Sequence, residues 1–139
     1  MMETMSPPTD GGRRGSGQRG ASAVEFALVL PLLMMLILGG VDWGVYFFRA
    51  QVVTNAVREA ARAGSLEIDD DTLATTAARD TAIGYLTQGL LDPTRALITP
   101  TLVAGAIRVD IVYPAGSITG FSEVIVPANV RASAEMRRR

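Results

Sequence analysis

The sequence predicts an α+β protein, in which a long N-terminal membrane-spanning helix continues into a small outer domain with a second helix and a short antiparallel sheet. An uncharged apolar run from Phe26 to Val41, extended by aromatic residues to Phe48, exceeds the roughly 20 residues that cross a bilayer. Small apolar residues at helical spacing follow this run, and the last third of the chain alternates apolar and polar residues as strands do. Of the 139 residues, 48% are hydrophobic, which is high for a soluble domain.

Four segments follow from these patterns. Residues 1–20 are rich in Gly, Pro and polar residues, so we expect a disordered cytoplasmic leader. Residues 21–48 form the predicted transmembrane helix, and residues 49–64 form its protruding amphipathic continuation. Residues 65–139 form the predicted small α+β outer domain. The protruding continuation carries one stripe of small apolar residues, namely Val53, Val57, Ala60 and Gly64.

Arginines set the expected orientation of the membrane helix. All 13 basic residues are arginines, and Arg13, Arg14 and Arg19 precede the apolar run. The positive-inside bias therefore predicts a cytoplasmic N-terminus, although further arginines after Phe48 weaken this bias. A cleaved secretory signal fits poorly, because the apolar run exceeds the ~7–15 residues of such signals and no small-residue cleavage site follows it. A plain uncleaved signal anchor remains an alternative.

Two further features belong to this helix. Pro31 removes one backbone hydrogen bond, which predicts a kink or a loosened turn unless it is an ordinary membrane-helix proline. An acid and several aromatic residues end the apolar run, and we expect them at the outer membrane interface, with packing against other helices as the alternative. These interface residues are Asp42, Trp43, Tyr46, Phe47 and Phe48.

The outer domain begins with an acidic triplet, Asp69 to Asp71. We expect it to cap a second helix that ends near Gly89, because the triplet lacks the spaced ligand pattern of a calcium loop, the alternative. The predicted apolar stripe of this helix contains Leu73, Ala77, Thr81 or Ile83, and Leu86.

Three segments read as strands. Alternation is clearest from Ile107 to Tyr113, and Pro100 confines the run from Leu97 to Val103 to a sheet edge. A further strand is expected from Val124–Val126 together with 130–136. Three short strands need an apolar cover, which the small-residue stripe of the first helix can provide.

The residue inventory argues against catalysis. The chain has no Cys and no His, and therefore no thiol nucleophile, imidazole base or soft metal ligand. Ser22, Glu25 and the scattered aspartates do not combine a nucleophile, a base and an orienting group, so we expect no enzyme. We also expect no cofactor, no metal site and, at a net charge of -1, no nucleic-acid partner.

Three stretches of the N-terminal half form a recognisable pattern. They are Gly20-Ala-Ser-Ala-Val-Glu25-Phe26-Ala-Leu-Val-Leu-Pro31-Leu, then Gly39-Gly-Val-Asp42-Trp-Gly44, and a motif of Gln51, Asn55, Arg58, Glu59 and Arg62. Together they resemble the TadE-like family of pilin-like proteins from the tight-adherence (Tad, Flp-type) pilus system. The similarity is strong from Arg19 to Gly64, whereas the C-terminal half matches only in general form. Asp42 departs from the family, which often carries Glu there, but keeps the charge.

The resemblance implies a processed pilus component. A membrane prepilin peptidase would cut the leader between Gly20 and Ala21, and Glu25, with Phe26 beside it, would take part in subunit assembly by meeting the Ala21 amine of an adjacent subunit. The implied partners are this peptidase, other pilins or pseudopilins, the inner-membrane assembly platform and the lipid bilayer. The implied location is the inner membrane, with a single pass, a periplasmic or extracytoplasmic C-terminal domain, and possible incorporation into an extracellular pilus.

The size of the chain bears on its role. Major fibre subunits of this system are, by resemblance, little more than the helix, whereas this chain adds a whole segment after Gly64. The resemblance therefore implies a minor pilin or pseudopilin that serves pilus assembly, adherence or secretion. The alternative is an uncleaved single-pass protein whose outer domain binds a partner or ligand.

Overall fold

The computed structural model describes residues 16–138, with side chains from residue 20 onward. Most of the predicted leader, residues 1–15, lies outside the described residues. The chain divides into two compact units, one up to Leu36 and one from Ile37 onward. The elements in chain order are α1 (Ser16–Leu66), α2 (Asp71–Gln88), the short 3-10 helix η1 (Pro93–Arg95), β1 (Leu97–Val103), β2 (Ala106–Pro114) and β3 (Asn129–Arg137).

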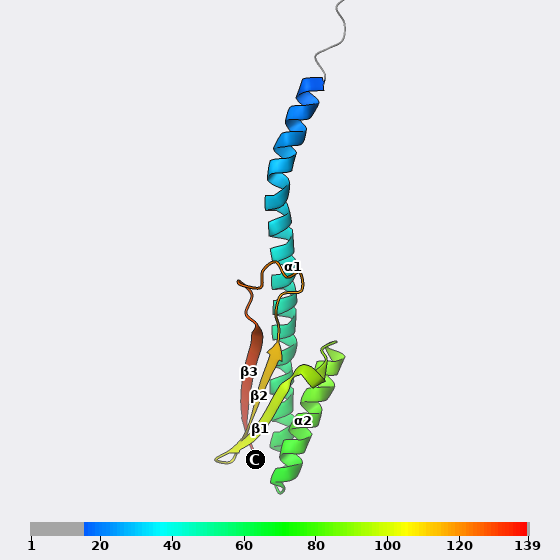
Figure 1. Ribbon diagram of the computed structural model, residues 1–139. Helices are drawn as coiled ribbons and strands as arrows, with labels where there is room; N and C mark the ends of the chain where they lie inside the picture. The colour runs from blue at the N-terminus through cyan, green and yellow to red at the C-terminus, as the bar shows by residue number, and fades with distance from the viewer. Residues whose placement is uncertain (1–15, 139) are drawn as a thin grey trace, which may run out of the picture. The chain divides into compact units, whose positions relative to one another are not determined.

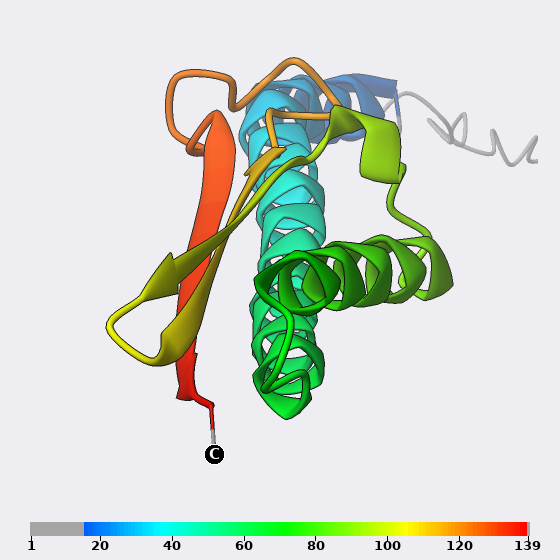
Figure 2. The ribbon, with the colours of Figure 1, turned by 90° about the horizontal axis from the view of Figure 1, so that it is seen from below.

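The predicted α+β fold class is confirmed. The three strands form one antiparallel sheet in the order β1-β2-β3, in which Val109 of the central strand pairs with Pro100 on one side and Ala134 on the other. Pro100 lies on an edge strand, as predicted, because its missing N–H needs no ladder partner there. The sheet and α2 both lie beside the part of α1 that belongs to the second unit (Figures 1 and 2).

The small-residue stripe of α1 covers the sheet, as its spacing predicts. Val53, Val57 and Ala60 are fully buried in one core cluster with the central residues of β2. Gly64 lies where α1 closely approaches α2 and β2, because a Cβ there would lie 2.5 Å from Ile107 Cδ1 and 2.8 Å from the carbonyl oxygen of Ala74. Only glycine allows α1, α2 and β2 to meet at this distance.

The predicted apolar stripe of α2 is only partly correct. Leu86 is buried, as predicted, but Leu73 is 55% exposed and Ile83 is also exposed. The other buried residues are Ala74, Ala78 and Ala82. The physical reason is the close approach at Gly64, where Ala78 Cβ would stand 3.1 Å from an added Cβ and larger side chains do not fit. The predicted cap is confirmed, since the Asp70 carboxylate accepts hydrogen bonds from two backbone N–H groups of the first turn.

The third strand is shorter than predicted. Val124–Val126 do not join it but lie in the segment between β2 and β3, which we call the C-terminal loop (Ala115–Ala128). Within it, the N–H groups of Ile125 and Val126 both donate to the Ser122 carbonyl, at 2.9 and 2.8 Å. This turn uses the amides that a strand ladder would need, so an apolar run is folded back as loop.

The second unit has two distinct ends (Figure 1). The C-terminal loop lies at the end where α1 enters the unit, and the connection between α1 and α2 lies at the opposite end. Arg138 ties the C-terminal segment to that connection. Its guanidinium donates to the carbonyl oxygens of Glu67 (2.9 Å) and Ile68 (2.7 Å) and to the Asp71 carboxylate (2.5 Å).

Candidate functional site

The N-terminal part of α1 is an apolar surface. Among the described residues, one helix is long and apolar enough to cross a membrane, and it is α1 from Gly20 onward. From Gly20 to Leu36 every side chain is exposed, including large ones such as Leu28 and Leu32. So many exposed apolar side chains on all sides of a helix are typical of a segment that lies in lipid.

The residues expected for processing and assembly all lie on this segment. Gly20, Ala21, Glu25 and Phe26 are exposed on α1, and the peptide bond between Gly20 and Ala21 is helical because α1 begins at Ser16. Nothing packs near Gly20, where an added Cβ would have no neighbour within 4 Å. Pro31 lies inside α1, and the helix is assigned without a break around it.

Asp42 occupies a different environment. It is only 2% exposed, although it lies on α1 directly after the apolar run. Its Oδ2 accepts hydrogen bonds from three hydroxyls of the C-terminal loop, those of Ser117 (2.5 Å), Thr119 (2.7 Å) and Ser122. Its Oδ1 accepts the backbone N–H groups of Ile118 (2.9 Å) and Thr119 (3.0 Å).

The two oxygens of Asp42 thus receive five hydrogen bonds and give none. An ionised carboxylate is an acceptor only, so it matches this ring of donors, whereas a protonated carboxyl would bring a hydrogen where a donor already points. One helix residue therefore fixes a loop that lies 75 residues later in the chain. Arg49 adds a contact about two helical turns further on, by donating to the Gly116 carbonyl at 3.2 Å.

The expected interface residues divide into two groups. Asp42 is buried and Tyr46 packs against the core, whereas Phe47 and Phe48 are exposed. Trp43 is half-buried and its ring lies 5.7 Å from that of Tyr46 and 5.5 Å from that of Phe47. The aromatic cluster therefore combines exposed rings with one ring that packs against the folded core.

The motif residues after the aromatic cluster lie on the outside of α1. Gln51, Arg58 and Arg62 are exposed, and Asn55 is half-buried. Arg62 forms an ion pair with Glu59, at 3.2 Å. The buried stripe of α1 uses none of these five side chains, so the core does not account for their presence.

Comparison with known families gives one match. Residues 20–62 match the family model described as TadE-like protein, which covers the exposed apolar segment, Asp42 and the motif residues. Through this segment, which is less than half of the chain, the chain is similar to the TadE-like family. No curated protein and no solved structure matches the chain.

The TadE-like match ends two residues before Gly64, so it excludes α2, the sheet and the C-terminal loop. The three loop hydroxyls that bind Asp42 are functional candidates that sequence reasoning missed. Their only signal is that three hydroxyl residues recur between Ser117 and Ser122 in an otherwise apolar stretch. Local pattern gives no means of pairing such a stretch with one acid of a distant helix.

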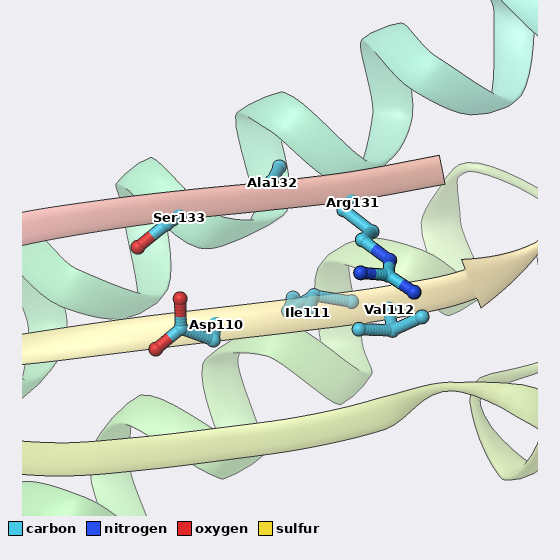
Figure 3. Close-up of a pocket in the computed structure, with 6 residues that line it drawn as sticks. All are labelled: Asp110, Ile111, Val112, Arg131, Ala132 and Ser133. Carbon is cyan, nitrogen blue, oxygen red and sulfur yellow. The ribbon is translucent and has the colours of Figure 1, made fainter. Parts of the chain in front are cut away.

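The outer face of the sheet offers no comparable site. A shallow, open hollow lies over β2 and β3, where Asp110 is paired with Ser133 and Val112 with Arg131 (Figure 3). These side chains are cross-strand neighbours on an exposed polar face and enclose no space. Among the residues that the structure describes, no group of His, Cys, Asp and Glu residues is arranged to hold a metal ion.

Proposed function

We propose that this chain is a minor pilin or pseudopilin-like component of a Tad (Flp-type) pilus, held in the inner membrane by α1 with its outer domain outside the cytoplasm. The observation that carries the proposal is the TadE-like match over residues 20–62, which coincides with the exposed apolar part of α1 and the residues just after it. The role in assembly, adherence or secretion would belong to the outer domain, which a bare fibre subunit lacks.

The bonds of Asp42 support a shorter membrane segment than the helix itself. A helix from Ala21 to Val41 rises about 30 Å at 1.5 Å per residue, the thickness of a bilayer core. From Asp42 onward, α1 is bonded and packed within the folded second unit. We therefore propose that residues 21–41 lie in the membrane and that Asp42 lies just outside it.

After processing, Glu25 would be the one charged side chain of the membrane segment, residues 21–41. A carboxylate in this apolar helix calls for a cationic partner, and cleavage before Ala21 would create one as the terminal amine of an adjacent subunit. Glu25 lies one helical turn from Ala21, near the end of the segment, so both groups would lie near the same bilayer surface.

Co-expression with a prepilin peptidase tests the processing step. We expect a protein shortened by the leader with Ala21 as its N-terminus, read by sequencing of the purified chain. Gly20→Val should block the cut, because a branched side chain at this position hinders the close approach of the protease that glycine allows. Gly17→Val is the matched control and should leave the cut intact. Recovery of only the full chain, or a cut elsewhere, contradicts the proposal.

Glu25→Gln tests the assembly step. The variant keeps the shape and removes the charge, so insertion and cleavage should persist while cross-linking to other pilins and piliation fall sharply. Glu59→Gln, at an exposed ion pair, is the control and should change neither, because such pairs contribute little. Unchanged piliation in Glu25→Gln would mean that the acid is only a tolerated interfacial charge.

The second candidate is an uncleaved single-pass anchor whose outer domain binds a partner or ligand. One observation favours it: α1 starts at Ser16, so the bond between Gly20 and Ala21 is helical, whereas proteases bind extended chain. N-terminal sequencing separates the two candidates, since only the pilin-like component loses its leader.

A further inference from the structure

The C-terminal loop (Ala115–Ala128) turns polar side chains inward and exposes apolar ones, which is the reverse of an ordinary surface loop. Its hydroxyls point inward onto Asp42, while four large apolar side chains face outward. The four exposed apolar residues are Ile118, Phe121, Val124 and Ile125, with Val124 98% exposed. Loops in water show the reverse arrangement, because polar groups are hydrated at little cost.

The apolar exposure of the loop is not a sign of loose structure. The loop is closed by a bond from the Ala115 N–H to the Ala128 carbonyl at 2.9 Å and by the turn at Ser122. Val126 is buried beneath it. The backbone is therefore held so that the four apolar side chains stay outside.

The attachment point of the loop fixes which surroundings it meets. Asp42 follows directly after Val41, the last residue of the proposed membrane segment, and the loop is bonded to Asp42 through both carboxylate oxygens. A segment held on that residue lies at the level of the bilayer surface. Val41, the residue before Asp42, is also an exposed apolar residue.

Charge distinguishes this end of the second unit from the other. The fourteen-residue span between β2 and β3 contains Glu123 as its one ionisable residue. The opposite end also exposes apolar side chains, Leu66, Ile68 and Leu73, but it interleaves them with Glu67 and the acidic triplet 69–71. The C-terminal loop, with one ionisable residue, is compatible with contact to lipid. The acidic opposite end is not, because ionised side chains are expensive to take out of water.

We propose that the C-terminal loop inserts Ile118, Phe121, Val124 and Ile125 into the interfacial region of the bilayer, as a second membrane contact beside α1. The proposal rests on the membrane anchor of the proposed function. Asp42 acts as the positioning residue, since it collects the loop hydroxyls and thereby leaves the apolar side chains facing the lipid. The contact would fix the rotation and tilt of the outer domain on the membrane, which one helix alone leaves free.

Single-cysteine labelling tests the contact, because the chain has no cysteine of its own. The full chain is reconstituted at low density in vesicles of phosphatidylcholine and phosphatidylglycerol, with a polarity-sensitive fluorophore at Val124→Cys. The matched control is Leu66→Cys, an exposed apolar position at the opposite end, and Leu28→Cys reports insertion of α1. Nitroxide-labelled lipids, with the quencher near the headgroup or deep in the acyl chain, measure depth.

We expect blue-shifted emission at Val124→Cys and loss of its fluorescence with the shallow nitroxide, no quenching at Leu66→Cys, and quenching by the deep nitroxide at Leu28→Cys. If positions 124 and 66 are quenched equally while Leu28→Cys is quenched by the deep nitroxide, the loop contact is overturned. The membrane anchor is then still supported. An unquenched Leu28→Cys overturns the anchor and the loop contact together. A third outcome is a blue shift at position 124 that occurs only at high protein density and is not accompanied by quenching from the nitroxide lipids. It would mean that a second copy of the chain covers the loop, and it would also overturn the proposal.

Discussion

The two ends of the outer domain are each held by one charged side chain, but in opposite surroundings. At the end next to the apolar helix, buried Asp42 gathers five donors of the C-terminal loop. At the other end, Arg138 reaches two backbone carbonyls and the exposed carboxylate of Asp71. Both contacts join segments that are far apart in the chain, yet only the first is sealed from water.

The difference in burial between the two ends predicts a difference in their local stability. A charge without water depends on its protein partners, whereas an ion pair with one exposed partner, such as Arg138 with Asp71, can exchange part of its bonds for solvent at lower cost. The Asp42 end should therefore behave as a single cooperative unit, and the Arg138 end should fray. Three substitutions test this difference between the two ends. They are given in descending order of the effect that we expect.

Asp42→Ala should have the largest effect. It leaves three hydroxyls and two amides without their acceptor, so the C-terminal loop should detach from α1. We expect proteolysis at the loop glycines, measured on the full chain in vesicles, to become faster by on the order of tenfold or more, which corresponds to about 1.4 kcal/mol or more in a local opening equilibrium. Trp43, the single tryptophan, should shift its emission at the same time.

Asp92→Ala is the matched control for the buried acid. Asp92 also accepts a hydroxyl and an N–H, both from Thr94, at 2.7 and 3.0 Å, but it is exposed. These bonds, the hydroxyl first, hold the pKa of Asp92 below its ordinary value, so its small stabilising effect is present at neutral pH and is lost as the pH falls through the folded-state pKa. Loop proteolysis should be unchanged; an acceleration equal to that of Asp42→Ala would refute the contrast between buried and exposed acids.

Gly64→Ala should have the next largest effect. The added methyl group would overlap Ile107 Cδ1 and the Ala74 carbonyl, so α2 and β2 must move apart, at a cost of about 1–3 kcal/mol in unfolding free energy. Gly84→Ala is the control, because its Cβ would meet nothing and alanine favours a helix interior by about 0.5–1 kcal/mol. Urea unfolding of the full chain in detergent, followed by Trp43 fluorescence, should show opposite signs for the two variants.

Arg138→Ala should have the smallest effect. The guanidinium is mostly buried but Asp71 is exposed, and solvent can replace part of the lost bonds, so we expect a loss of about 1 kcal/mol. The neighbouring Arg137→Ala, at an exposed side chain, should stay within about 0.5 kcal/mol of the parent chain. Hydrogen exchange should show faster opening around Glu67 and Ile68 only. Faster exchange in the C-terminal loop would show instead that the two ends are coupled.

The sequence predicts the local elements of this fold and misses the contacts between distant ones. Long runs with one period, such as the apolar helix and the strand from Ile107 to Tyr113, show their structure because each repeat adds to the same signal. The face of α2 was missed because alanine carries little hydrophobic signal, and because the burial of Ala74 and Ala78 is decided by Gly64 on another helix. Tertiary packing therefore overrides a stripe of larger apolar residues.

The candidate site shows the same limit. The helix residues Gly20, Ala21 and Glu25 are recognisable because they are close together in the chain and match one family pattern. Asp42 was expected at a membrane interface, and its buried bonds to the loop come from residues that no local pattern connects with it. For an acid that follows an apolar helix, the neighbouring sequence can therefore predict its depth relative to a membrane. It cannot predict which distant residues bind the carboxylate.

The distance in sequence between Asp42 and its loop also sets an order of events during synthesis. A ribosome that adds about 5–20 residues per second makes the loop roughly 4–15 s after the acid, because 75 residues separate Asp42 from Ser117. Throughout that interval the carboxylate has only water to satisfy it. In the membrane arrangement proposed above, the nascent helix would therefore stop with Asp42 already outside the hydrocarbon. The loop, made later, would then bind Asp42 at a depth that insertion has fixed.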